Sequence, residues 1–425
     1  MIALLFTLLG VGLAIGLPVY LSLAASSLVA LALATSIPLT VVAQRMFAGI
    51  NSFTLMAVPF FIFTANVMNR GGLAPRIVKL SNALVGHMRG GIAFTVVLSC
   101  MFLGAVSGSA PATVVAICTL MLSMMVDAGY SKGFSIGLIM ASASVAVIIP
   151  PSIGMIVFGS VTGTSVGELF IAGFLPGIVY GASFMLLSYI YARVRKLPVA
   201  KRASFREVLG AFKHAGFALG IPVVIIGGIY GGLCTPTEAA GISTVYAIIV
   251  SVFIYKELSL KDLVKVAYES AVGTAQVMVI LAGAGVFAWV MTRFQVPVML
   301  TNAVMALGSS KFAILMMINL ILLVAGMFLD PASIQTIMSP LFLPVALSVG
   351  VNPVHLGIIM VVNGAIGMFT PPFGLNMFVA SGVTGIPLST LIKTVWPWVI
   401  VSILALLLIT YVPWIAMALP NLLYR

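Results

Sequence analysis

The chain has 425 residues, of which 62% are hydrophobic and only 7% are charged. A soluble globular domain carries roughly a quarter charged residues, so this composition excludes one and indicates a chain whose solvent is the lipid bilayer. The net charge of +12, from 20 basic and 8 acidic residues, is interpreted as a determinant of membrane orientation, not as a nucleic-acid-binding surface.

Apolar runs close to the roughly 20 residues that cross a bilayer recur along the whole chain. In the first half they lie near 2–17, 20–36, 54–69, 91–106, 110–126, 133–162 and 168–192. In the second half they lie near 214–232, 238–255, 268–291, 312–328, 334–348, 354–384 and 394–418. The sequence therefore predicts an all-α polytopic membrane protein with seven apolar segments in each half.

The linker 193–213 holds seven basic residues and one acid, Glu207. It is too polar to insert, so the positive-inside rule predicts that it is cytoplasmic. Contact with anionic lipid headgroups is an alternative role for the same charges. We count membrane crossings in both directions from this linker. Most other basic residues then fall on the cytoplasmic side, provided that 91–126 and 312–348 each return to the side from which they entered.

With those placements, residues 1–192 begin outside and end inside, whereas residues 214–425 begin inside and end outside. We therefore predict two inverted repeats, with both termini outside. A weak repeat in the sequence agrees, because Ile149-Pro150-Pro151-Ser152-Ile153-Gly154 aligns with Thr370-Pro371-Pro372-Phe373-Gly374-Leu375, and the same offset carries Ser109 onto Asp330. Inverted repeats with interrupted helices are typical of secondary transporters.

Each repeat has an apolar stretch that is broken by a polar tip. Ser107-Gly108-Ser109 divides 91–126, and the segment ending in Asp330 divides 312–348. The arms are slightly short for full crossings, so we expect two re-entrant helical hairpins whose tips approach each other from opposite faces. An ordinary exposed loop between two spanning helices is the alternative for the first tip.

Paired prolines lie inside the long segments 133–162 and 354–384. Proline removes an amide donor and blocks the preceding turn, which predicts either a kink or an unwound link. Unwound carbonyls with nearby hydroxyls would form oxygen cages suited to sodium. The expected ligands are Ser107, Ser109, Ala146, Ile149 and Ser152 in the first cage, and Gly326, Gly367, Thr370 and Phe373 in the second.

Three charged residues lie at or near hydrophobic depth. Asp330 precedes Pro331 and is interpreted either as a helix cap or as a substrate or ion ligand. Glu238, in Thr235-Pro236-Thr237-Glu238, is better explained by a capping box. Arg293 either extends to the membrane interface or binds a substrate carboxylate.

The chain resembles the large membrane subunit of TRAP transporters, the tripartite ATP-independent periplasmic carriers of bacteria. The resemblance spans nearly the whole chain and rests on an ordered series of motifs: Met46-Phe47-Ala48-Gly49, Pro59-Phe60-Phe61, Met68-Asn69-Arg70-Gly71-Gly72, Ser107-Gly108-Ser109-Ala110, Ile148-Ile149-Pro150-Pro151-Ser152, Leu169-Phe170-Ile171-Ala172-Gly173 and Pro236-Thr237-Glu238-Ala239-Ala240-Gly241. The sequence looks most like the sialic-acid branch. It departs from many relatives at Pro111, which affects the shape of the first tip.

The resemblance implies an elevator mechanism in the bacterial inner membrane, coupled to sodium, with both termini in the periplasm. It implies two partners, a small four-helix membrane subunit and a periplasmic protein that delivers the substrate, here expected to be sialic acid. It also implies that Ser107, Ser109, Arg293 and Asp330 line the substrate and ion region.

Four other functions are alternatives. A C4-dicarboxylate TRAP permease and a stand-alone sodium/dicarboxylate symporter would share the hairpins and broken helices. An intramembrane enzyme is not indicated, because the chain has no HExxH, no paired intramembrane aspartates and no serine–histidine pair. A purely structural subunit would not need polar tips and opened helices.

Overall fold

The computed structural model describes residues 2–306 and 310–424, which fold into helices without any strand. The helices of the first half are α1 (Ile2–Ala14), α2 (Val19–Ala34), α3 (Thr40–Ile50), α4 (Ala57–Arg70), α5 (Leu73–Val85), α6 (Gly91–Ser107), α7 (Ala110–Asp127), α8 (Lys132–Ala143), α9 (Ile153–Thr162) and α10 (Val166–Val194), with the short turns η1 (Phe53–Met56) and η2 (Ser144–Val147). Those of the second half are α11 (Phe205–Tyr230), α12 (Pro236–Ile248) with its π-helical extension η3 (Ile249–Ile254), α13 (Leu260–Arg293), α14 (Val296–Ala306), α15 (Lys311–Gly326), α16 (Pro331–Ser348), α17 (Pro353–Gly367), α18 (Leu375–Thr384), α19 (Leu388–Tyr411) and α20 (Trp414–Leu423).

Among the described residues, six helices are long and apolar enough to cross a membrane, or seven if α3 and α4, bent by 60°, count as one span. Nine further apolar helices have only 10–17 residues. The hairpin arms α6 and α15 and the helices beside the proline pairs are among these shorter pieces. The chain is therefore a multi-pass helical membrane protein that combines helices long enough to cross a membrane with shorter apolar helices.

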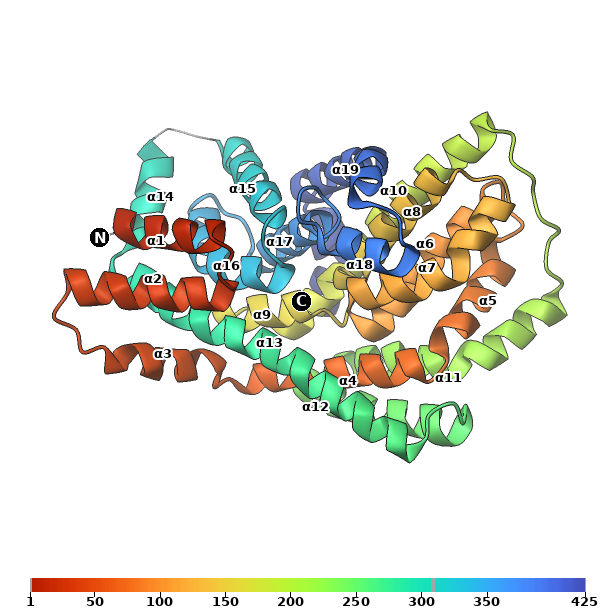
Figure 1. The fold of residues 1–425 in the computed structure, drawn as a ribbon, viewed down its shortest axis with the longest axis horizontal. Helices are drawn as coiled ribbons and strands as arrows, with labels where there is room; N and C mark the ends of the chain where they lie inside the picture. Colours follow the sequence, from red (N-terminus) through yellow and green to blue (C-terminus); the bar gives the residue numbers. More distant parts are fainter. Residues whose placement is uncertain (1, 307–309, 425) are drawn as a thin grey trace.

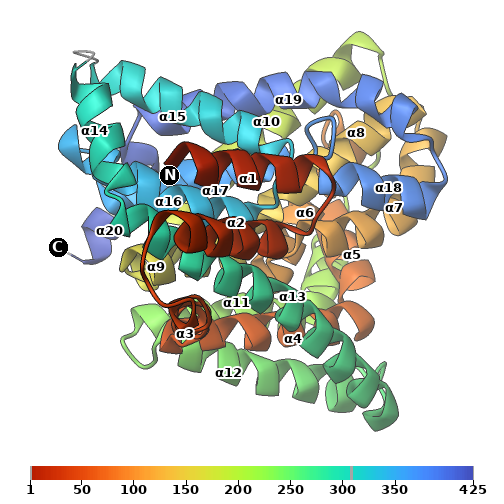
Figure 2. The same cartoon turned by 60° about the vertical axis from the view of Figure 1, so that its left-hand side comes forward.

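The helices α3, α4, α11, α12 and α13 form one side of the molecule (Figures 1 and 2). The long helix α13 packs on α2, α3 and α4, while α12 packs on α4 and α11. Glycines permit the closest of these approaches, since a Cβ atom at Gly285 of α13 would lie 2.9 Å from the Cα atom of Gly49 of α3. We call α3, α4, α11, α12 and α13 the outer layer.

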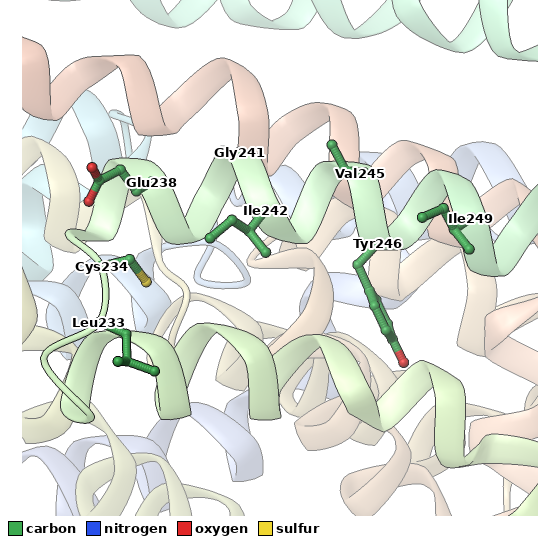
Figure 3. A pocket seen from close by; sticks show the side chains of 8 residues that line it. All are labelled: Leu233, Cys234, Glu238, Gly241, Ile242, Val245, Tyr246 and Ile249. Carbon is green, nitrogen blue, oxygen red and sulfur yellow. The ribbon is translucent and has the colours of Figure 1, made fainter.

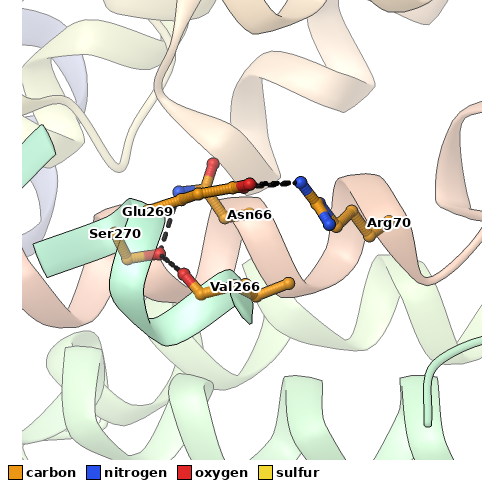
Figure 4. A network of polar contacts seen from close by, with 5 residues as sticks. All are labelled: Asn66, Arg70, Val266, Glu269 and Ser270. Carbon is orange, nitrogen blue, oxygen red and sulfur yellow. Dashed lines mark hydrogen bonds and ion pairs between the residues drawn. The ribbon is translucent and has the colours of Figure 1, made fainter. Parts of the chain in front are cut away.

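Polar contacts join α4 to α13 inside the outer layer (Figure 4). Arg70 forms an ion pair with Glu269 at 2.6 Å. One turn earlier, Asn66 donates to the Ser270 hydroxyl at 2.9 Å, and that hydroxyl donates to the Val266 carbonyl at 2.7 Å. These contacts connect a helix of the first half to a helix of the second.

Two helix–tip–helix units recur at matching places in the chain. The first is α6 and α7, joined at Gly108-Ser109, and the second is α15 and α16, joined by residues 327–330. Each unit is followed by a helix that is interrupted at its proline pair, α8 and η2 before α9 in the first half and α17 before α18 in the second. Both α9 and α18 have 10 residues and end at a left-handed glycine, Gly163 (φ 74°) and Gly385 (φ 67°).

The two sets of elements pack crosswise. The second arm of the first unit, α7, packs against α18, and the second arm of the other unit, α16, packs against α9. The buried helix α17 contacts α9, α15 and α16. Each tip is thereby positioned against elements that come from both halves of the chain.

Four helices lie outside the predicted apolar segments or divide one of them. The helices α3, α5 and α14 have only 11, 13 and 11 residues, which is too short for a long apolar run. In α5, Arg76 and Lys79 also interrupt the apolar pattern. The segment predicted at 394–418 is divided between α19 and α20, because Pro413 has no N–H to continue the helix. Short helices are the part of the fold that the hydropathy pattern misses.

Candidate functional site

A cavity of about 310 Å³ lies where the two tips and the two interrupted helices meet. The first tip contributes Gly108 and Ser109, and the second contributes Asp330. The other lining residues are Ala110, Pro111, Val147, Ile153, Gly154, Gln276, Val277, Pro331, Ala332, Val361, Met368 and Leu375. We call this space the tip cavity.

The first tip is a tight turn built around Gly108. Gly108 has φ of 57°, and a Cβ atom there would lie 2.5 Å from the Pro151 carbonyl oxygen, so only glycine fits. Ser109 is half-buried and caps α7, with its hydroxyl accepting from the Ala112 amide at a long 3.5 Å. Ser107 is buried, and its hydroxyl accepts from the Ser109 amide at 3.3 Å.

The second tip carries the only ionisable side chain in the lining of the tip cavity, Asp330. One carboxylate oxygen accepts from the Ala332 amide at 3.0 Å and from the Ser333 amide at 3.1 Å. The other oxygen accepts from the Ser333 hydroxyl. Asp330 is therefore the N-cap of α16 and also lines the cavity. Its position is compatible with a role as a helix cap and with a role as a substrate or ion ligand.

The first set of predicted sodium ligands lies behind the first tip. A Cβ atom at Gly104 of α6 would lie 2.5 Å from the Cα atom of Ala146, so this arm and the interrupted helix touch backbone to backbone. Ile149 and Ser152 lie in the link 148–152, where the Ser152 hydroxyl donates to the Val147 carbonyl at 2.6 Å. The hydroxyl thus satisfies a carbonyl that the interruption of the helix leaves free.

The second set repeats this arrangement. A Cβ atom at Gly326 of α15 would lie 3.1 Å from the Cα atom of Gly367, at the end of α17. The Thr370 hydroxyl donates to the Ile366 carbonyl at 2.6 Å, as Ser152 does in the first half. The Phe373 side chain is exposed and lies beside the Phe328 ring, with centroids 5.8 Å apart.

Of the four residues predicted to line the substrate region, Ser109 and Asp330 line the tip cavity, whereas Ser107 and Arg293 are not part of its lining. Arg293 is exposed in the last turn of α13, whereas Gln276 of the same helix lines the cavity. At 1.5 Å per residue, the two positions are roughly 25 Å apart along the helix. In this conformation Arg293 contributes no charge to the cavity.

Two residues of this region were not predicted from the sequence. Gln276 enters the cavity from α13, and Gln335 of α16 is buried one turn below the tip. Both are uncharged polar residues inside apolar helices, a signal that sequence analysis can detect but cannot assign to a particular cavity. Among the described residues, no three His, Cys, Asp or Glu side chains gather to hold a metal ion.

A larger cavity of about 740 Å³ lies on the outer layer, between the end of α11 and α12 (Figure 3). It is lined mainly by apolar side chains such as Leu233, Ile242 and Ile249 and by none of the predicted site residues. Glu238, at its edge, forms the capping box predicted for it, accepting from the Thr235 amide at 2.7 Å. Size alone would select this surface groove, but the polar groups converge on the tip cavity.

The fold and the tip cavity define a multi-pass membrane protein that gathers two polar tips and two opened helices around one small space. Residues 6–415 match the family described as "Tripartite ATP-independent periplasmic transporter, DctM component". The chain belongs to this family of large TRAP permease subunits, as the motif series predicted. It is therefore a transporter permease of the inner membrane and not an enzyme, and its family works with a small membrane subunit and a periplasmic binding protein.

Several relatives are described as permeases of a stated substrate. The chain is 44% identical to the C4-dicarboxylate large permease of Pseudomonas aeruginosa over 89% of each chain, and 42% identical to that of Rhodobacter capsulatus over 96% of each. It is 36% identical to the sialic acid large permease of Vibrio cholerae, over 96% of this chain and 95% of that one. The expected likeness to the sialic-acid branch is thus weaker than the likeness to the dicarboxylate permeases.

The fold also resembles that of a solved transporter. The structure described as the Alcanivorax borkumensis YdaH transporter, with an unusual topology, superposes with a TM-score of 0.56 and covers 90% of this chain and 88% of that one. The two sequences are 16% identical, so the likeness concerns the fold alone.

Proposed function

We propose that this chain is the large permease subunit of a sodium-coupled importer of a C4-dicarboxylate. The observation that carries the proposal is the tip cavity, which joins Ser109 and Asp330 from tips on opposite halves of the chain. Such convergence of repeats around a small space is the arrangement in which secondary transporters bind substrate and ions.

The choice of substrate rests on two supports. The dicarboxylate permeases are more similar to this chain than the sialic acid permease is. The cavity of about 310 Å³ also lies at the small end of the range of ligand sites, about 300–1,000 Å³. A four-carbon diacid is much smaller than sialic acid and suits a space of this size.

The charges of the cavity favour cation coupling. Its lining contains the Asp330 carboxylate and no basic side chain. A dianion brought beside a carboxylate is repelled unless cations accompany it. We assign those cations to the two oxygen-rich sets, Ser107, Ser109, Ala146, Ile149 and Ser152 behind the first tip, and Gly326, Gly367, Thr370 and Phe373 behind the second.

The proposed mechanism is an elevator between two inverted repeats, 1–192 and 214–425, joined by the cytoplasmic linker 193–213. The two helix–tip–helix units would be re-entrant hairpins that move with the interrupted helices, while the outer layer stays fixed. Recurrence of the tips, interruptions and left-handed glycines supports the repeats. Both termini would then be periplasmic.

Arg293 has a place in this mechanism although it lies outside the present cavity. It stands on α13, the same outer-layer helix that contributes Gln276 to the cavity. A displacement of the tips along α13 would bring them toward Arg293 in the other end state of the elevator cycle. We propose that a substrate carboxylate meets this guanidinium there.

Two protein partners belong to the proposal. A small four-helix membrane subunit would join the outer layer, and a periplasmic binding protein would deliver the dicarboxylate. Membrane lipid would surround the remaining surface, with the basic linker beside the anionic headgroups of the cytoplasmic leaflet.

Uptake of labelled succinate into proteoliposomes tests the function. The vesicles would hold this chain with its small subunit, with and without an inward sodium gradient and the binding protein. Uptake that requires both is the expected result. Sodium-driven uptake without the binding protein would favour a stand-alone symporter, and uptake of sialic acid in place of succinate would refute the assigned substrate.

A further inference from the structure

Gln335 is a buried polar side chain with an unpaired donor. Its exposed fraction is 0%, and its Nε2 atom has no hydrogen-bond partner among the described residues. Its Oε1 atom accepts only a long bond of 3.4 Å, from the Ser339 hydroxyl. An unsatisfied buried donor costs about 1–3 kcal/mol, so its presence needs an explanation.

The position of Gln335 supplies one. Pro331 and Ala332, in the first turn of α16, line the tip cavity. Gln335 follows them by four and three residues and so lies on the same face of the helix, one turn deeper. From the other side, Gly154 of α9 lines the cavity, and a Cβ atom there would lie 3.9 Å from the Gln335 Cγ atom. The stem of the Gln335 side chain therefore lies beside Gly154, a residue of the cavity wall.

We propose that Gln335 is a specificity-determining residue, whose Nε2 group donates to one carboxylate of the transported substrate. The inference rests on the proposed function, and it names a residue that would bind one carboxylate of that substrate. A carboxylate accepts hydrogen bonds and cannot donate them, which matches the two free N–H groups of Nε2. Because the acceptor is charged, this bond is stronger than one between neutral groups.

The surroundings fit a ligand that arrives from the cavity. Asp330 is not a partner of the amide, since its oxygens accept from the backbone of residues 332 and 333 and from the Ser333 hydroxyl. Gly154 has no side chain to separate the amide from the cavity. A methyl group there would meet Ser152, Val361 and the Gln335 Cγ atom at 3.7–3.9 Å, so it would fit and would stand between the Gln335 side chain and the cavity.

The first experiment replaces the amide with an apolar side chain of similar length, Gln335→Met, in the complete carrier with its small subunit and binding protein. KM for succinate should rise roughly tenfold or more, which corresponds to about 1.4 kcal/mol or above. The sodium concentration for half-maximal uptake should stay the same. The melting temperature should stay equal or rise, because the variant removes an unsatisfied donor.

Two further variants separate donation from other roles. Gln335→Glu keeps the size but replaces the donors with a charge, so it should abolish succinate uptake. Gly154→Ala leaves the amide intact but places a methyl group between the Gln335 side chain and the cavity, so KM should rise without loss of thermal stability. The matched control is Ser339→Ala, which removes the only partner of Oε1 and should change KM by less than about twofold.

Three results would overturn the proposal. An unchanged KM in Gln335→Met would show that the amide does not touch the substrate. A lower melting temperature in that variant would identify a structural role. A change in sodium dependence with KM unchanged would mean that the amide presents its oxygen to a cation. Wild-type uptake is measured in parallel, and its absence would refute the proposed function itself together with this inference.

Discussion

The two tips have the same backbone plan and different chemistry. Each follows an arm whose glycine touches the interrupted helix, Gly104 on Ala146 and Gly326 on Gly367. The first tip presents a serine hydroxyl, held by one long cap bond of 3.5 Å. The second presents Asp330, held by two amides at 3.0 and 3.1 Å and by the Ser333 hydroxyl.

This difference indicates that the two tips have different roles at the cavity. The carboxylate of the second tip is fixed in place and supplies the only charge, so it can attract a cation and keep it at one position. The first tip is uncharged, and a Cβ atom at Gly104 would lie closer to the interrupted helix than one at Gly326, 2.5 Å against 3.1 Å. We therefore expect the first tip to tolerate little steric change and the second to tolerate little change in charge.

The largest expected effect is steric and lies at the first tip. In Gly104→Ala the new methyl group would lie 2.5 Å from the Ala146 Cα atom, a backbone atom that cannot move aside. Overpacking of this kind costs typically about 1–3 kcal/mol, so the variant should melt at a lower temperature and lose uptake. Gly326→Ala, with a contact of 3.1 Å, is the matched variant and should be milder. Equal melting temperatures for the two variants would contradict the proposed difference in packing.

The next effect is electrostatic and lies at the second tip. Asn is as good an N-cap as Asp, so Asp330→Asn should preserve α16 and leave the melting temperature nearly unchanged. Removal of the charge should weaken cation binding by about 1.5–3 kcal/mol, or roughly 10- to 100-fold. Sodium titration of succinate uptake measures this loss. Normal sodium dependence in Asp330→Asn would exclude the carboxylate from coupling.

A smaller effect is expected for Ser109→Ala. The cap bond to the Ala112 amide is long, so its loss should cost near the low end of the usual range of about 0.5–2 kcal/mol. Uptake should fall only a few-fold, since one neutral oxygen is removed from the cavity. Thermal melting and uptake kinetics of the same preparation measure both quantities. A loss of uptake as large as that in Asp330→Asn would contradict the expected difference between the two tips.

The tips were predictable because proline and glycine act locally. A proline pair interrupts a helix wherever it occurs, and Pro331 after Asp330 marks the start of a helix in the sequence itself. The interruptions at 148–152 and 368–374 and both tips therefore lie where the sequence placed them. The short helices α5 and α14 were not predicted, because packing on neighbours stabilises them more than any apolar run of their own.

The roles of Gln276 and Gln335 near the cavity could not be predicted for a different reason. Gln276 and Gln335 are single polar residues in long apolar helices, and their use depends on how those helices are rotated and packed. Arg293 was assigned to the cavity by resemblance, but the length of α13 separates it from Gln276. Local rules identify residues beside a helix break, whereas contacts between distant helices require the three-dimensional arrangement.

The smallest effect is expected at the ion pairs Arg70–Glu269 and Arg76–Glu257, none of whose residues line the tip cavity. Glu269→Gln removes the pair with Arg70, whose two side chains are 39% and 40% exposed, so solvent screening should limit the cost to about 1 kcal/mol or less. Glu257→Gln removes a pair with Arg76, which is 24% exposed and also lies 4.0 Å from the centroid of the Tyr255 ring, so its effect should be slightly larger. Neither variant should change the KM for succinate. A clear rise in KM for either one would mean that these ion pairs affect the cavity, and the comparison between the tips would then have to include them.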